Sequence, residues 1–276
     1  MWYKNGENFK EENGYNINGE WYPRVTRIIQ VKSKPALEYF FKEVGNYSAV
    51  QDIKNKSAEE GTVTHKIIQR LILGEVPDVP REFSAIATAF EKFNLGGRIK
   101  SNTDLIERKI WSTSDRYAGT ADAIAFIDGK FGVLDIKTST GFYPDYNLQT
   151  AAYVSALREE KLKNHISLPK EIETRWILRV DQHRLCKKCA SSLRLKGGRH
   201  KVRMGNGLAS SSTWRSGRRN GNYPCREGEH DWGFSEGIVE LKEFPEVEND
   251  LRAFRAAKVL WEWENDYWLK QIGYLK

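Results

Sequence analysis

The sequence predicts an α/β protein in which helices flank a mixed central sheet and one late segment is inserted as a separate module. Three observations predict this class. Strand-like apolar runs flank the pair Asp128-Gly129, stretches with apolar residues at helical spacing precede and follow them, and a Ser-, Gly- and Arg-rich segment separates two later strand-like runs. We therefore expect one domain over residues 21–276, interrupted by an insertion at 182–233 and preceded by a loose polar arm at 1–20.

Local patterns predict the elements in chain order. The expected helices are 36–42, 57–73, 82–95, 145–159 and 246–270. The expected strands are 105–111, the two arms of a hairpin at 117–138, 175–180 and 237–241. Pro35 precedes the first helix, where proline is tolerated, and Gly96-Gly97 ends the third.

Composition narrows the class of protein. The chain has 276 residues, of which 39% are hydrophobic and 12% aromatic, enough for one sizeable core. Its apolar runs are too short to span a bilayer, and its first residues lack the apolar stretch of a signal peptide. Three cysteines, an odd number, argue against a disulfide framework. We expect a cytoplasmic protein without a membrane partner.

The hairpin at 117–138 carries the most informative pattern. Asp-Gly between apolar runs is typical of a two-residue type I′ turn, which places Ile127 opposite Lys130 and, counting outward, Asp122 opposite Asp135. Facing carboxylates repel each other, so a divalent cation is expected to offset them. Such hard oxygen ligands suit Mg²⁺ or Mn²⁺.

The period of two along the second strand adds a cation to this pair. Lys137 falls on the same face as Asp135, while Leu134 and Ile136 point to the opposite face and into a core. We therefore expect two carboxylates and one ammonium group on a solvent-facing side of the hairpin. The alternative is a surface hairpin with ordinary charges.

Three motifs in order give these residues a context. They are Gly119-Thr-Ala-Asp122, Asp135-Ile-Lys137 and Gln149-Thr-Ala-Ala-Tyr153. Together they resemble the G-x-x-D, D-x-K and Q-x-x-x-Y pattern of the PD-(D/E)XK nuclease superfamily, in its RecB-like exonuclease branch. A lone D-x-K is weak evidence, whereas all three motifs at these spacings are specific. The resemblance covers about 20–180 and 235–270, leaves the insertion outside, and implies a restriction-endonuclease-like core.

The resemblance also implies roles for these residues. Asp122, Asp135 and the Ile136 carbonyl would bind catalytic Mg²⁺ or Mn²⁺, which generates hydroxide and bridges phosphate oxygens. Lys137 would orient the attacking water or stabilise developing charge. Gln149 and Tyr153 share one helix face and would position Lys137 and the phosphate.

Other motifs admit two interpretations each. His65, in Gly61-Thr-Val-Thr-His65, resembles the G-x-x-x-H motif whose imidazole joins the metal site, but a histidine beside an apolar stripe is also a common core residue. Glu107 resembles the acidic residue that precedes G-x-x-D, or is one charge on a solvated strand face. The stretch Tyr22-Pro-Arg-Val-Thr26 is similar to the opening of some RecB-like exonucleases, those of the mitochondrial genome maintenance type included, or is a turn that packs apolar side chains.

The insertion carries two cysteine-containing pairs. Cys186-x2-Cys189 and Cys225-x4-His230 have the residue types of a tetrahedral Cys₃His site, which suits structural Zn²⁺. The alternative is three unligated thiols. An iron–sulfur cluster is disfavoured because the fourth thiolate is missing.

The insertion is also strongly basic. Residues 181–230 hold 12 Lys or Arg against 3 Asp or Glu, so this segment carries +9 while the whole chain carries +7. Such clustering is typical of nucleic-acid binding, and a solvated basic loop is the alternative. The residues expected to contact DNA are Arg194, Lys196, Arg199, Lys201, Arg203, Trp214, Arg215, Arg218 and Arg219.

The resemblance implies a metal-dependent deoxyribonuclease of bacterial or phage-like type. We expect an exonuclease that acts on DNA that is single-stranded or has a free end, in replication, recombination or repair. A structure- or site-specific endonuclease and a non-catalytic nucleic-acid-binding protein are the alternatives.

Overall fold

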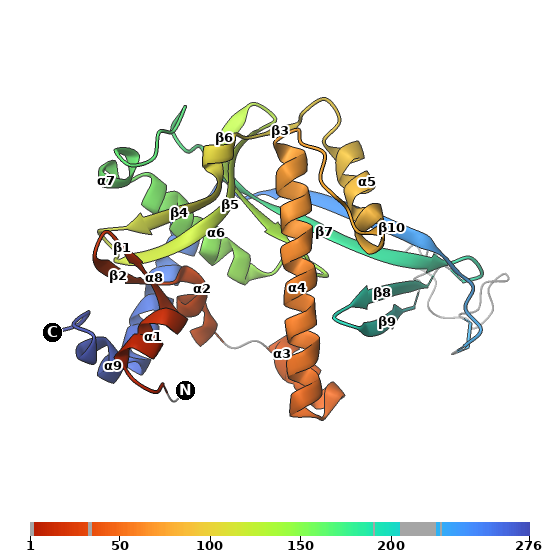
Figure 1. The fold of residues 1–276 in the computed structure, drawn as a ribbon, viewed down its shortest axis with the longest axis horizontal. Helices are drawn as coiled ribbons and strands as arrows, with labels where there is room; N and C mark the ends of the chain where they lie inside the picture. The colour runs from red at the N-terminus through yellow and green to blue at the C-terminus, as the bar shows by residue number, and fades with distance from the viewer. Residues whose placement is uncertain (1–2, 33–34, 190, 205–224, 227) are drawn as a thin grey trace.

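The computed structural model describes residues 3–32, 35–189, 191–204, 225–226 and 228–276 (Figure 1). Its helices are α1 Gly6–Asn13, α2 Val25–Ile28, α3 Pro35–Val44, α4 Tyr47–Ile72, α5 Ser84–Phe93, α6 Pro144–Leu157, α7 Glu160–Lys163, α8 Glu248–Glu264 and α9 Asp266–Gln271. Its strands are β1 Gly14–Ile17, β2 Glu20–Pro23, β3 Ile99–Lys100, β4 Ile106–Ser112, β5 Tyr117–Ile127, β6 Lys130–Lys137, β7 Thr174–Cys186, β8 Ser192–Lys196, β9 Arg199–Arg203 and β10 Trp232–Glu243.

One mixed sheet of eight strands forms the centre of the described protein. Its order is β3-β5-β6-β7-β8-β9, with β4 also paired to β5 and β10 also paired to β7. The β6–β7 pair is parallel and the other pairs are antiparallel. Parallel neighbours need a crossover, and α6 and α7 lie in the connection between β6 and β7. The predicted α/β class with a mixed central sheet flanked by helices is confirmed.

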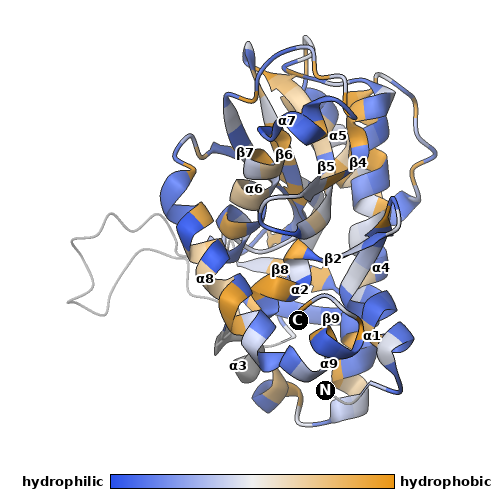
Figure 2. Ribbon diagram, turned by 90° about the vertical axis from the view of Figure 1, so that its left-hand side faces the viewer, coloured by the Kyte–Doolittle hydropathy of each residue, from blue (hydrophilic) through white to orange (hydrophobic). Residues whose placement is uncertain are grey.

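Helices cover both faces of the sheet, so the core has two halves. On one face, Leu134 and Ile136 of β6 pack with Ile68 of α4 and Phe90 of α5. On the other face, residues of β5 and β6 pack with α6 and α8, and Figure 1 shows α4 and α6 on opposite sides of the strands. The helices carry both hydrophilic and hydrophobic residues, as expected when one face lies on a sheet (Figure 2). A strand covered on both faces is buried almost throughout, as β6 is, and its apolar residues Val133, Leu134 and Ile136 face the two halves of the core.

The expectation of a loose arm at 1–20 is wrong for residues 3–20. Asn5 caps α1 by accepting a hydrogen bond from the Asn8 backbone N–H, and Phe9 is fully buried against the rings of Trp21 and Trp261. The hairpin β1–β2 turns at Asn18-Gly19, both with positive φ. Asn-Gly is a hairpin signal, so the sequence contained evidence against a loose arm.

Several predicted boundaries also move. The helix expected at 57–73 begins at Tyr47, after an Asn46 cap, and the helix expected at 246–270 divides at Asn265 into α8 and α9. The strand expected at 175–180 continues to Cys186, because β10 pairs with it from Trp176 to Cys186. None of the helices in the described ranges combines the length and apolar character needed to cross a bilayer.

The described ends of 182–233 are part of the central sheet rather than a wholly separate module. The final part of β7 lies in this segment, and β8 and β9 form a hairpin that joins the sheet through β7. The hairpin turns at Gly197-Gly198, whose φ values are +60° and +76°.

Candidate active site and candidate metal centre

The turn predicted at Asp128-Gly129 is present and determines the register. Both residues have positive φ, 49° and 84°. Paired residues run from Ile127–Lys130 to Ala123–Leu134, so Asp122 and Asp135 follow as the next two residues, as the sequence predicts. There the Asp122 carboxylate accepts a hydrogen bond from the Ile136 backbone N–H at 2.7 Å. The side chain of Asp122 is thereby held against β6.

Asp135 lies in a hydrogen-bonded network with three residues of the predicted motifs. The Lys137 ammonium donates to Asp135 Oδ1 at 3.1 Å and to Gln149 Oε1 at 3.0 Å. The Gln149 amide donates to Asp135 Oδ1 at 2.9 Å and to the Tyr153 hydroxyl at 3.1 Å. The face of α6 that carries Gln149 and Tyr153 therefore lies over β6.

One expectation about this network is wrong. Asp135 was expected on a solvent-facing side of the hairpin, but α6 covers that face and Asp135 is only 1% exposed. A buried carboxylate needs partners, because leaving water is costly for a charge. The network supplies them on Oδ1, while Oδ2 lies 2.9 Å from Lys137 Nζ and accepts no hydrogen bond of normal geometry from the described residues.

Gly119, the first residue of the G-x-x-D motif, has a packing role. A Cβ at this position would lie 2.5 Å from the Tyr153 ring. Contacts this short do not occur between real side chains, so only glycine lets the ring lie directly on β5. The first and last of the three motifs are thus linked by direct contact.

A second group of potential ligands lies beside this network. His65 Nδ1 is 3.4 Å from Asp122 Oδ1, and one ligand atom each from His65, Glu107 and Asp122 lie within 4.8 Å of one another. These three residues line a cleft of about 610 Å³ together with Gly61 and Thr138. His65 is therefore beside the carboxylates rather than within the core.

Gln69 is a site residue that the sequence analysis missed. Its buried amide donates hydrogen bonds to the Glu107 carboxylate and, at 3.2 Å, to the Asp122 backbone carbonyl. It follows His65 by four residues on α4 and so shares its face. That spacing was the available signal, but glutamine spacing on a helix has no chemical specificity by itself.

Glu107 has a strained backbone. Its φ is +49°, although Ile106 and Arg108 on either side pair regularly with β5. Left-handed backbone costs a non-glycine residue about 1 kcal/mol and persists only where the surroundings enforce it. This conformation puts the Glu107 carboxylate beside Gln69, within the ligand group.

The charges in the cleft shift one another's protonation. Burial raises the pKa of Asp135 to about 6, and the Asp122 charge adds to this while Lys137 opposes it. For Asp122 the effect of burial is outweighed by the hydrogen bond and charge of His65 and by Lys137, so its pKa is lowered. Burial also acts against the charge of Lys137, but Asp135 and Asp122 outweigh it and raise the pKa of this ammonium.

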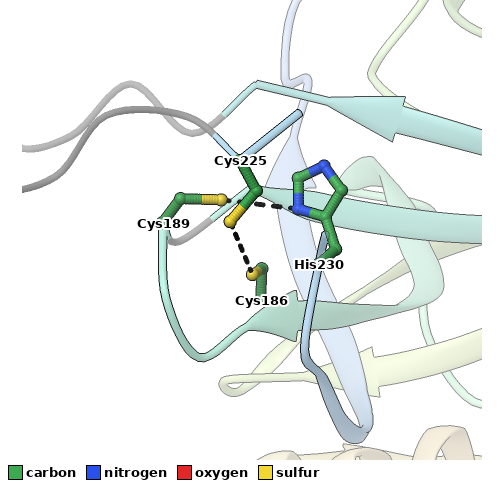
Figure 3. Close-up of side chains that lie close together, drawn as sticks. All are labelled: Cys186, Cys189, Cys225 and His230. Atoms are coloured by element: carbon green, nitrogen blue, oxygen red, sulfur yellow. Dashed lines mark hydrogen bonds between the residues drawn. The ribbon is translucent and has the colours of Figure 1, made fainter. Parts of the chain in front are cut away.

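The cysteines and histidine of the insertion are brought together (Figure 3). The Sγ atoms of Cys186 and Cys225 are 3.9 Å apart, and Cys189 Sγ is 3.5 Å from His230 Nδ1. The four ligand atoms lie within 4.8 Å of one another and could hold a metal ion. The cysteines are unpaired thiols, since 3.9 Å is far beyond a disulfide bond length.

The thiols of this group affect one another's protonation: burial and the neighbouring Cys189 and Cys186 raise the pKa of Cys225 to about 11, whereas the surroundings of Cys189 act the other way. The backbone N–H groups of Cys225 and Ser191 and the Ser191 hydroxyl lower the pKa of Cys189 to about 5. His230 stacks on Trp232 with ring centroids 4.5 Å apart. Trp232 is in turn the β10 residue paired with Cys186 of β7, so the group joins the ends of two long strands.

The predicted DNA-contacting residues that the structure describes line one groove of about 380 Å³; they are Arg194, Lys196, Arg199, Lys201 and Arg203. Arg194 forms an ion pair with Asp181 at 2.7 Å, and Arg199 forms one with Glu43 at 2.7 Å. Trp214, Arg215, Arg218 and Arg219, which were also predicted to contact DNA, lie outside the described residues.

The motif at residues 22–26 packs as its second interpretation predicted. Val25 and Ile28 are fully buried, and Arg24 bridges to Ala118 of β5.

Comparison with protein-family models and with curated proteins finds no match to this chain.

Proposed function

We propose that this protein is a divalent-metal-dependent nuclease with a restriction-endonuclease-like core, which hydrolyses DNA phosphodiester bonds from DNA ends. The observation that carries the proposal is the network of Asp135, Lys137, Gln149 and Tyr153 beside Asp122. Buried charges are costly, and titratable groups perturbed by burial and by a charge partner in a cleft mark a candidate functional site. Their arrangement matches the needs of phosphate hydrolysis, which are a cation site and a fixed ammonium group.

The donor set fits Mg²⁺ or Mn²⁺. Asp122, Glu107 and His65 offer two carboxylates and one imidazole, and the Asp135 Oδ2 oxygen has no normal hydrogen bond among the described residues. When bound, such a cation lowers the pKa of a coordinated water and offsets charge on phosphoryl oxygens. Glu107 enters this set as a ligand, a more specific role than the sequence suggested. The Ile136 N–H donates to Asp122, and this contact does not involve the Ile136 carbonyl. The carbonyl therefore stays a predicted ligand.

Lys137 and Gln149 would position the reacting groups rather than bind the cation. Lys137 stays protonated because two carboxylates surround it, so it would donate to a phosphoryl oxygen or the attacking water rather than act as a base. Gln149 restrains both Lys137 and Asp135. Its contribution would be to keep the ammonium in the reactive geometry.

We further propose that Cys186, Cys189, Cys225 and His230 hold a structural Zn²⁺. A tetrahedral zinc with bonds of about 2.3 Å to sulfur and about 2.0 Å to nitrogen separates two sulfurs by about 3.8 Å and a sulfur from a nitrogen by about 3.5 Å. The separations of 3.9 and 3.5 Å agree with this.

One experiment tests the catalytic proposal. Purified protein is incubated with end-labelled single-stranded DNA, end-labelled duplex and covalently closed circles, each with Mg²⁺, Mn²⁺ or EDTA. We expect metal-dependent loss of the linear substrates and intact circles. Cutting of circles would favour the endonuclease alternative, and binding without cleavage under any metal would favour a non-catalytic DNA-binding protein.

A further inference from the structure

The β8–β9 hairpin reaches the catalytic cleft through Lys196. Its ammonium lies 3.2 Å from the hydroxyl of Thr138, the residue after Lys137, and Thr138 lines the same cleft as His65 and Asp122. Arg194 of the same strand donates to the Thr138 backbone carbonyl at 3.1 Å. The insertion was expected to stand apart from the catalytic residues, but β8 contacts the end of the catalytic strand directly.

The tip of the hairpin is docked on α4, which keeps Lys196 in place. A Cβ on Gly197 would lie 2.2 Å from the Ser57 hydroxyl and 2.6 Å from the Ile53 carbonyl oxygen, so this turn packs as closely as its backbone allows. The Gly197 N–H donates to Glu60 Oε2 at 2.9 Å. The backbone of Lys196 is therefore positioned by the docked turn, and its side chain by the hydrogen bond to Thr138.

Lys196 is a largely buried cation whose charge is poorly compensated. Its side chain is 17% exposed, and the Glu60 oxygen beside it is 4.0 Å away, beyond hydrogen-bond distance. Burial lowers the pKa of this lysine. A partly desolvated ammonium with a free donor direction favours an anionic ligand.

A basic groove continues from this point. It is lined by Phe40 of α3, by Lys54 and Ser57 of α4, and by the basic side chains of β8 and β9, and Ser57 also lines the catalytic cleft. No Asp or Glu is among the described residues that line it, although Asp181 and Glu43 pair with two of its cations from outside. The β8–β9 hairpin lies beside α4 in Figure 1, and residues of both elements line the groove.

We propose that Lys196 and Thr138 bind the phosphate next to the one that is cleaved, and that the groove behind them takes a single DNA strand. This inference rests on the proposed nuclease function. A single strand bends at each phosphate and can follow a narrow groove with two walls, where basic side chains track the backbone and an aromatic ring such as Phe40 contacts a base. A duplex is stiff over this distance and carries its phosphates on a wide cylinder, so it follows a groove of this kind less well than a single strand does.

The test compares Lys196→Met with Lys187→Met. Lys187 belongs to the same segment and carries the same charge, but its side chain is 63% exposed and forms a solvent-exposed ion pair with Asp231 at 3.8 Å. Binding of a fluorescent oligothymidylate is measured in EDTA over a range of KCl concentrations, after circular dichroism and thermal unfolding show that both variants fold. We expect Lys196→Met to weaken binding about tenfold and to flatten the salt dependence by about 0.7 in slope, the loss of one phosphate contact. Lys187→Met should change affinity less than twofold, and Lys196→Arg should retain most of it.

Position along the strand is tested with neutral methylphosphonates placed singly in the oligonucleotide. For the wild type, the neutral group beside the cleaved bond should weaken binding most, and Lys196→Met should be insensitive at that position alone. Equal behaviour of the two Met variants, or undiminished sensitivity in Lys196→Met, would overturn the assignment, and equal binding of duplex would overturn the single-strand groove. If the wild type cleaves no DNA in any metal but the Lys196 effects in EDTA hold, the nuclease proposal fails while the groove stands.

Discussion

The two clusters of potential metal ligands lie toward opposite ends of one strand, β7, and are held in different ways. The proposed catalytic network lies where β7 pairs with β6, under α6 and between two apolar layers. The Cys₃His group begins at Cys186, the last residue of β7, and its other half follows a stretch outside the described residues. One cluster is positioned by the packing around it, and the other lies at strand ends that are joined by backbone hydrogen bonds such as that from the Lys187 N–H to the Asp231 carbonyl.

This difference predicts opposite responses to loss of a metal. At the catalytic cluster the hydrogen bonds among Asp135, Lys137 and Gln149 exist without a cation, so the site should keep its shape when the cation is removed. At the Cys₃His group, the binding free energy of a metal would be folding free energy for the segment.

The largest effect is expected for Asp135→Asn, which keeps the shape of the residue and removes its charge. Cleavage should fall about a thousandfold or more, the scale on which loss of an electrostatic contact to the transition state acts. The fold should persist, because packing rather than charge positions β6. Initial rates with end-labelled DNA measure the loss of cleavage, and circular dichroism shows whether the variant keeps its fold.

Asp115→Asn is the matched control. It also removes one carboxylate charge, but Asp115 forms its ion pair with Arg255 of α8 and does not belong to the network. Its rate should stay near that of the wild type. Cleavage by Asp135→Asn at the wild-type rate would refute the catalytic assignment.

A smaller effect, on stability, is expected for Cys189→Ser. Elemental analysis should show about one zinc per wild-type chain and none in the variant. The melting temperature should fall by several degrees, and proteolysis should begin within 191–231, because the ends of β7 and β10 lose their link. Ser192→Ala in the neighbouring strand should change neither the zinc content nor the melting temperature. A zinc-free wild-type protein of undiminished stability would remove the metal centre.

The smallest effect concerns pH and the metal-free catalytic cluster. The pKa of Asp135 is raised by burial from 3.8 to about 6, so the folded state binds this proton more tightly than the unfolded chain. That contribution to stability is fully present below about pH 4 and is lost as pH rises through about 6, where the carboxyl ionises. A shift of about two units corresponds to a change of about 3 kcal/mol.

The measurement is the free energy of unfolding in EDTA between pH 4 and 7.5, for the wild type and Asp135→Asn. Stability of the wild type relative to the variant should fall over this range. Stabilisation by Mn²⁺ should increase over the same range, because the cation competes with the proton. Parallel pH profiles for the two proteins would show that Asp135 titrates normally.

Much of the catalytic hairpin could be predicted because its determinants are local. The two-residue turn at Asp128-Gly129 sets the register, and the period of two then decides which residues share a face. Gln149 and Tyr153 follow from helical spacing in the same way. The Cys₃His group was predictable because thiol and imidazole chemistry restricts what such residues do together.

Other parts of the site depend on contacts that leave no periodic signal. Gln69 joins the cluster because α4 crosses β4 and β5, and Glu107 turns toward it through a left-handed backbone that no local rule requires. The helix α1 was missed because a short polar stretch reveals little until Phe9 is seen among the rings of α8 and α9.

Local sequence therefore determined the turn, the facing of Asp122 and Asp135 and the identity of the potential ligands. Only the tertiary structure decided that α6 buries Asp135 and that the docked turn at Gly197 brings Lys196 to Thr138. The physical reason is that turn geometry and strand period act over a few neighbouring residues. Burial and charge compensation depend on which distant elements pack together, and that is decided by the core as a whole.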